Sequence, residues 1–178
     1  MTEEQLKQLI RSVPDFPRPG ILFRDVTTLI GNGEGFAAAV ALMADRSRAV
    51  DAQAIIGIEA RGFIFGAAVA ANLRLPFVPI RKPGKLPVPS LALDYALEYG
   101  TDTLELDPEA LPAGTAVVLL DDLIATGGTA LAAAELVQRA GWRIDLALFL
   151  IDLPDLGGGA RLRAHGLAAE AIVDFPGH

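Results

Sequence analysis

The chain has 178 residues, enough for a single domain with a sizeable core and too few for two ordinary ones. Hydrophobic residues make up 52% and no apolar run approaches the roughly 18 residues of a membrane span, so we expect a compact cytoplasmic protein without a membrane partner. A net charge of −7 argues against nucleic acid as a main partner, and the absence of cysteine excludes disulfides and thiolate zinc sites.

The N-terminal segment is predicted to form a helix followed by a short strand. Apolar residues recur at helical spacing from Leu6 to Val13, with Thr2 as a candidate N-cap, so we expect a surface helix over residues 2–13. Prolines at positions 14, 17 and 19 end this helix and stiffen the approach to a short strand around residues 21–23. Taken alone, that strand is more readily explained by packing than by ligand binding.

Basic residues follow two of the next predicted strands. After a predicted helix over residues 35–50, a buried strand at residues 54–58 leads to Arg61 and to a helix over residues 63–72. A third strand, residues 76–80, leads to the segment Arg81-Lys82-Pro83-Gly84-Lys85. The carboxyl ends of parallel strands share one edge of a sheet, so these cations would lie together there. An arginine at a turn or a run of charges is, by itself, more often a solvated surface feature.

Residues 86–107 do not continue the pattern of buried parallel strands. Two half-polar segments, at positions 93–99 and 103–106, flank the turn residues Gly100-Thr101-Asp102. This arrangement predicts a hairpin that can close over a site as a lid.

The most informative segment is VVLLDDLIATGGTA, positions 117 to 130. Its apolar start predicts a strand buried on both faces, and Asp121 and Asp122 come where that strand would leave the sheet. The glycines and threonines at positions 126–129 then precede a helix over residues 130–140, a combination that suits phosphate. Two carboxylates beside a phosphate cradle suit the hydroxyls of a sugar phosphate.

This segment also has two alternative interpretations. An isolated Gly-Gly turn is a tight connection about as often as it is a phosphate loop. A Walker-B-like metal site would need a G-x-x-x-x-G-K-[ST] motif elsewhere, and the chain has none.

The C-terminal third supplies more of the same architecture. Gly141 stops the preceding helix, Trp142 is expected to pack at a strand entrance, and strands are predicted at residues 144–151 and 168–173. The glycine run at positions 157–159 is interpreted as a flexible connection, and the two histidines receive no role. Strands that alternate with helices predict an α/β fold, a mostly parallel twisted sheet flanked by helices with an antiparallel hairpin at its edge.

Several segments together resemble the type I phosphoribosyltransferase family. Besides VVLLDDLIATGGTA, the matching segments are FPRPGILFRDVTTLI at 16–30, IIGIEARGFIFGAAVA at 55–70, FVPIRKPGKLP at 77–87 and LEYGTDTLEL at 97–106. The resemblance implies one phosphoribosyltransferase domain over residues 1–178. Residues 1–33 would form a helix and a hood over the base, and residues 86–107 a flexible lid.

The resemblance also implies roles for individual residues. Phe23 would stack on the base, and the main chain around Arg24 would contact it. The acids Asp121 and Asp122 would hold the ribose hydroxyls of 5-phosphoribosyl 1-diphosphate (PRPP). The phosphate-binding residues would be Ala125, Thr126, Gly127, Gly128 and Thr129. The residues that face the diphosphate would be Arg61, Lys82 and Lys85.

The implied reaction is Mg²⁺-dependent transfer of the phosphoribosyl group from PRPP to adenine, giving AMP and diphosphate, in a homodimer. Glu98 on the lid is the candidate for the purine proton, unless it only holds the hairpin shut, and Arg61 assists the leaving group. Mg²⁺ would be held mainly by PRPP and water, near Asp121 and Asp122.

Two alternatives remain at this stage. In enzymes for 6-oxopurines an acid usually stands at the position of Ala125, so the methyl group there favours adenine over hypoxanthine, guanine or xanthine. A PRPP-sensing regulator would be expected to carry a basic surface or a helix-turn-helix, and this acidic chain shows neither. The run of apolar residues at positions 87–93 departs from the more polar lid of the family.

Overall fold

The computed structural model describes residues 1–96 and 100–177. In the described chain the helices are α1 (Glu3–Gln8), α2 (Thr27–Ile30), α3 (Gly33–Ala49), α4 (Gly62–Leu73), α5 (Gly128–Arg139), η1 (Pro154–Leu156) and α6 (Gly158–Ala164). The strands are β1 (Arg11–Pro14), β2 (Leu22–Asp25), β3 (Ala54–Ile58), β4 (Phe77–Ile80), β5 (Leu91–Ala96), β6 (Thr101–Leu106), β7 (Ala116–Ile124), β8 (Arg143–Asp152) and β9 (Ala169–Asp174). Within these ranges, no helix is both long enough and apolar enough to cross a membrane.

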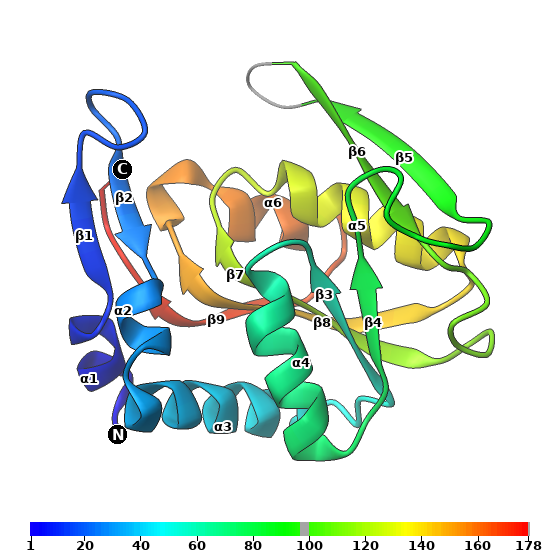
Figure 1. Ribbon diagram of the computed structural model, residues 1–178, viewed down its shortest axis with the longest axis horizontal. Coiled ribbons are helices and arrows are strands. Elements are labelled where there is room, and N and C mark those ends of the chain that lie inside the picture. The colour runs from blue at the N-terminus through cyan, green and yellow to red at the C-terminus, as the bar shows by residue number, and fades with distance from the viewer. Residues whose placement is uncertain (97–99, 178) are drawn as a thin grey trace.

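A five-stranded parallel sheet forms the centre of the molecule, in the order β4-β3-β7-β8-β9 (Figure 1). Its strands are buried on both faces, as their continuous apolar runs predict. Along β7, Val118 and Leu120 belong to the apolar cluster on the side of α3 and α4. Their neighbours Val117 and Leu119 belong to a second cluster on the side of α5. The predicted α/β fold is therefore confirmed.

The strand order reverses between β3 and β7. From β3 the chain moves outward to β4, whereas β7 pairs with the other edge of β3 and the chain then moves away through β8 and β9. In open α/β sheets, ligands bind in the crevice at the carboxyl ends of the strands beside such a reversal. The topology therefore places a site beyond the ends of β3 and β7.

The lid hairpin is present as the antiparallel pair β5 and β6. It forms a two-stranded sheet of its own, joined to the end of β4 by a single bridge between Arg81 and Glu105. Figure 1 shows the hairpin projecting beyond α5. The first strand is described as far as Ala96, and its predicted continuation to position 99 lies outside the described part of the chain.

The predicted N-terminal helix is too long. Thr2 does cap α1, with its side chain accepting from Gln5 N and the Gln5 side chain accepting from Thr2 N, but the helix ends at Gln8. Residues Arg11–Pro14 instead form β1, which pairs with β2. The apolar spacing continued past Gln8 because Ile10 is buried and Val13 lies half-buried opposite Phe23, not because the helix continues.

Two further expectations are wrong in detail. Strand β7 continues through Asp121 and Asp122 to Ile124, because β8 pairs with it as far as Asp152. The glycines at positions 157–159 are not a flexible connection, since α6 begins at Gly158 and both Gly158 and Gly159 are buried. Trp142 packs as expected, buried with its indole N–H donating to the Leu111 carbonyl.

Candidate active site

A pocket of about 1010 Å³ opens at the carboxyl ends of β3 and β7. It is lined by residues of the loops after β3 and β4, the hairpin, β7, the loop before α5, β8, η1 and α6. Its charged lining residues are Glu59, Arg61, Lys82, Asp102, Asp121, Asp122 and Arg161. The other predicted lining residues that the structure brings there are Ala125, Thr126, Gly127, Gly128 and Thr129.

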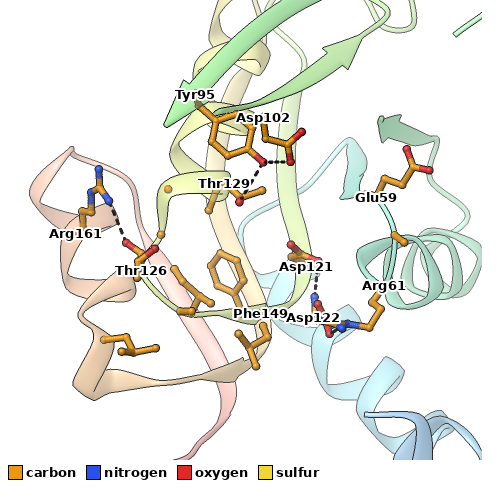
Figure 2. A pocket seen from close by; sticks show the side chains of 18 of the residues that line it. Glu59, Arg61, Tyr95, Asp102, Asp121, Asp122, Thr126, Thr129, Phe149 and Arg161 are labelled. Atoms are coloured by element: carbon orange, nitrogen blue, oxygen red, sulfur yellow. Dashed lines mark hydrogen bonds and ion pairs between the residues drawn. The ribbon is translucent and has the colours of Figure 1, made fainter. Parts of the chain in front are cut away.

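The two aspartates form the acidic floor of this pocket (Figure 2). The Asp122 side chain is 5% exposed and accepts a hydrogen bond of 2.5 Å from Arg61 Nε. Burial, followed by the charge of Asp122, raises the pKa of Asp121 well above its usual value. Gly62, the first residue of α4, lies so close that a Cβ there would be 2.7 Å from Asp121 Oδ1. The helix therefore packs directly against the acidic pair.

Arg61 links this floor to the predicted hood. It immediately precedes α4, and its guanidinium carbon lies 5.6 Å from the centre of the Phe23 ring. Phe16 packs edge-on against the same ring at 5.2 Å. The predicted base platform thus stands beside the arginine predicted to assist the leaving group, although Phe23 is not part of the pocket lining.

The Arg24 side chain is directed elsewhere. It is buried, with its guanidinium carbon 4.4 Å from the centre of the Phe175 ring, and it donates to Ser12 Oγ and the Pro176 carbonyl. This side chain ties the hood to the C-terminal segment, so a contact with a base at this position would have to come from the main chain, as the resemblance implied.

Two of the predicted cations already have acidic partners. Lys85 lies outside the pocket lining, and its ammonium contacts Glu59 Oε1 at 2.6 Å. Glu59 also accepts a hydrogen bond of 2.7 Å from Lys82 N, so it orients the loop that carries both lysines. The Lys82 ammonium forms an ion pair with Asp102 of β6. Burial acts to lower the pKa of Lys82, but the hydrogen bonds and charge interactions with Asp102 and Tyr95 together outweigh it and the pKa is raised.

Hairpin residues contact both ends of the pocket. Tyr95 and Asp102 are cross-strand partners, and the Tyr95 hydroxyl donates to Asp102 Oδ2 at 3.3 Å. Thr129 Oγ1 donates to the same Tyr95 hydroxyl at 3.4 Å (Figure 2). The lid therefore lies across the site, between the lysine loop and the first turn of α5.

The loop before α5 has the geometry of an anion cradle. Gly127 has a φ of +80°, a conformation that glycine adopts without strain, and α5 begins at Gly128. Its first N–H groups have no partner within the helix, and the helix dipole favours negative charge at this end. The loop is held by α6, because Gly158 N donates to the Ala125 carbonyl at 2.9 Å.

Sequence reasoning missed three of the pocket's polar side chains, Tyr95, Asp102 and Arg161. The pairing of the hairpin strands could have indicated the first two, since it sets Tyr95 opposite Asp102. Arg161 was lost because the glycines before it were interpreted as a flexible connection. Glu98, the candidate for the purine proton, lies outside the described residues.

Asp121 and Asp122 suit a metal ion that binds together with a phosphate ligand better than an ion held by the protein alone. Among the described residues, no group of three or more acidic, histidine or cysteine side chains is placed to hold an ion. Asp121 and Asp122 supply two neighbouring carboxylates. Mg²⁺ needs six oxygens, usually from one or two carboxylates, phosphates and water. The donor set therefore suits an ion that brings phosphate oxygens with it.

Comparison with known proteins agrees with this geometry. Residues 28–155 match the phosphoribosyl transferase domain. The chain belongs to this family of phosphoribosyltransferases.

Individual proteins similar to this chain have names more specific than that of the family. The chain is 63% identical to an adenine phosphoribosyltransferase of Novosphingobium aromaticivorans, over all of both chains. The crystal structure of adenine phosphoribosyltransferase from Thermoanaerobacter pseudethanolicus superposes with a TM-score of 0.92 and 42% identity, covering 98% of this chain and 100% of that one. The Saccharomyces cerevisiae enzyme, complexed with an imino-altritol bisphosphate and adenine, is 35% identical with a TM-score of 0.90, covering 96% and 98%.

Proposed function

We propose that this protein is an adenine phosphoribosyltransferase, a purine-salvage enzyme that converts adenine and PRPP to AMP and diphosphate. The main observation behind this proposal is that one pocket contains an acidic pair, an arginine, a lysine and a phosphate-type loop, which come from separate sequence segments. The names of its relatives supply the base.

The proposed reaction breaks the bond between the ribose anomeric carbon and the diphosphate oxygen. The bond electrons leave with diphosphate, and adenine N9 forms the new bond to the same carbon while adenine loses a proton. Positive charge develops on the sugar ring on the way, as in glycoside chemistry. Asp121 and Asp122 would hold the ribose hydroxyls and stabilise that charge, while Arg61 and Lys82 would stabilise the charge that develops on the leaving group.

Magnesium would be held chiefly by the diphosphate and water, near Asp121 and Asp122, and when bound it would neutralise part of the leaving group's charge. Lys85 would add positive charge from just outside the pocket, where it now pairs with Glu59.

The hood would provide the base site. Phe23 offers an aromatic face beside Arg61, and the main chain of β2 offers hydrogen-bonding groups near Arg24. Ala125, in the loop after β7, cannot exchange a proton with a 6-oxopurine, which favours adenine. We assign the transfer of the purine proton to Glu98, and we expect Glu98→Ala to lower kcat about a hundredfold while leaving the KM values within about threefold.

We further infer that residues 1–178 act as one phosphoribosyltransferase domain in a cytoplasmic homodimer. Helix α4 supports the dimer, because its apolar sequence leaves Ile64 41% exposed. The phosphorylated substrates favour the cytoplasm, since such charged sugars do not cross membranes unaided. Light scattering of the purified protein would test the dimer, and a monomer at micromolar concentration would contradict it.

The decisive assay measures diphosphate release after the protein is mixed with PRPP, Mg²⁺ and one purine at a time. Release with adenine, and little with hypoxanthine, guanine or xanthine, is the expected result. Turnover of a 6-oxopurine without turnover of adenine would overturn the choice of base. Binding of PRPP without release for any purine would favour a PRPP sensor.

A further inference from the structure

The loop that would hold the 5′-phosphate is surrounded by little assigned positive charge. A phosphate monoester carries nearly two negative charges at pH 7. The loop offers N–H groups, two hydroxyls and the positive end of a helix dipole worth roughly half a charge. The acids Asp121 and Asp122 border the same pocket and contribute no positive charge. The assigned residues therefore leave the phosphate charge only partly balanced.

Arg161 lies at this end of the pocket. Its side chain extends from α6 toward the loop, and Nη1 donates to the Thr126 carbonyl at 3.3 Å (Figure 2). A guanidinium has five N–H donors in one plane, so a bond to one carbonyl leaves others available for an anion. Arg161 is thus both placed and able to contact a phosphate seated on the loop.

The other basic side chains of the pocket are already engaged by carboxylates. Arg61 is paired with Asp122, and Lys82 is paired with Asp102. In residues 1–96 and 100–177, by contrast, the contact found for Arg161 is a main-chain carbonyl and no ion pair with an acid. Its full charge remains available to a ligand, whereas the other two must first exchange a partner.

The fold holds α6 in a fixed relation to the loop. A Cβ on Gly127 would lie 3.2 Å from Gly158 Cα, and a Cβ on Gly158 would overlap the Ala125 carbonyl. With the hydrogen bond from Gly158 N to that carbonyl, this close packing joins the start of α6 to the loop. Arg161 lies one turn further along α6. The guanidinium is therefore held beside the loop by backbone contacts.

We propose that Arg161 binds the 5′-phosphate of PRPP and AMP and supplies the positive charge that the loop itself lacks. This inference rests on the proposed function, because it needs a sugar 5-phosphate as the ligand. It adds to that function a residue of α6, an element outside the loop and the strand ends that carry the rest of the site.

The test compares AMP with adenosine, which differ by the phosphate alone. Dissociation constants of both ligands are measured by calorimetry for wild type, Arg161→Gln and Arg161→Lys. We expect Arg161→Gln to weaken AMP about tenfold and to leave adenosine unchanged, and Arg161→Lys to recover at least half of the loss on a logarithmic scale. Arg163→Gln is the matched control, because Arg163 lies on the same helix and donates to the Ala169 carbonyl instead.

Several results would overturn the proposal. One is AMP affinity in Arg161→Gln within twofold of wild type, and another is an equal loss for adenosine and AMP. A third is an Arg161→Lys variant no better than Arg161→Gln, since that would assign the effect to the bond with the Thr126 carbonyl rather than to charge. Diphosphate release by the wild type tests the proposed function separately, so either idea can fail while the other stands.

Discussion

At the end of the pocket beyond β3 and β4, Arg61 and Lys82 are each paired with a carboxylate, whereas at the loop before α5 the Arg161 guanidinium contacts a main-chain carbonyl. A diphosphate that approaches the first end must compete with Asp122 and Asp102 for its cations. A phosphate that approaches the second end meets N–H groups and a cation already oriented for it. Binding would therefore depend on exchange of partners at one end and on preorganisation at the other.

The largest expected effect comes from a substitution at the end of the pocket beyond β3 and β4, where the cations would exchange partners. Asp122→Ala removes a buried carboxylate that holds Arg61, and it also removes a proposed partner of the ribose hydroxyls. We expect kcat/KM for PRPP to fall about a thousandfold. Steady-state kinetics measure the loss, and Asp122→Asn, which keeps the shape, controls for misfolding. PRPP turnover equal to wild type would show that the site is misassigned.

A second substitution tests the preorganised end. Gly158→Ala places a methyl group against the Ala125 carbonyl, 2.7 Å from Ile124 Cγ1 and 2.9 Å from Gly127 N, so the loop must shift. We expect about 2 kcal/mol less free energy of unfolding and about a fivefold loss of AMP affinity. Gly33→Ala serves as the control, because nothing lies within 4 Å of a Cβ there. Unchanged AMP affinity in a destabilised variant would show that the loop needs no support from α6.

The ion pair between Arg11 and Asp25 in the hood provides a comparison, because no substrate is expected to displace either partner. Asp25 accepts hydrogen bonds from Thr27 and from Arg11, which together lower its pKa to about 2. A lowered pKa stabilises the fold above the unfolded value near 4, and the contribution is lost as the pH falls toward 2. We expect Asp25→Asn to lower the free energy of unfolding by about 1 to 2 kcal/mol at pH 7 and by about half as much at pH 3.

Urea denaturation at the two pH values measures this difference, and an equal deficit at both would contradict it. The comparison then separates two kinds of pairing. The Arg11–Asp25 pair contributes to stability, whereas the pairs with Arg61 and Lys82 would mainly affect ligand affinity.

How well each region could be predicted depends on whether adjacent residues or distant ones determine its structure. The apolar run at β3 and the acid-glycine pattern around β7 and α5 identified the sheet and the loop, because buried strands and turns depend on adjacent residues. The strand β1 was missed because its partner, β2, lies beyond a loop with several prolines. The pairing of Lys82 with Asp102, and the approach of Arg161 to Thr126, join segments far apart in the chain. Composition and spacing carry no record of such contacts.

The smallest effect concerns the lid, and it bears most directly on the exchange of partners. Asp102→Asn removes the carboxylate that now holds Lys82, while an amide can still accept from the Tyr95 hydroxyl. If the carboxylate competes with diphosphate for the lysine, its removal should tighten diphosphate binding about threefold, measured by calorimetry with Mg²⁺ present. The direction follows from charge, because the variant leaves the lysine uncompensated and takes one negative charge from the pocket.

Asp94→Asn is the matched control, since Asp94 lies on the same hairpin and accepts from Thr103 rather than from a lysine. Weaker diphosphate binding in Asp102→Asn would reverse the interpretation, because Asp102 would then orient Lys82 for the ligand instead of competing with it. In that case both ends of the pocket would be preorganised, with a carboxylate holding the cation at one end and a main-chain carbonyl doing so at the other.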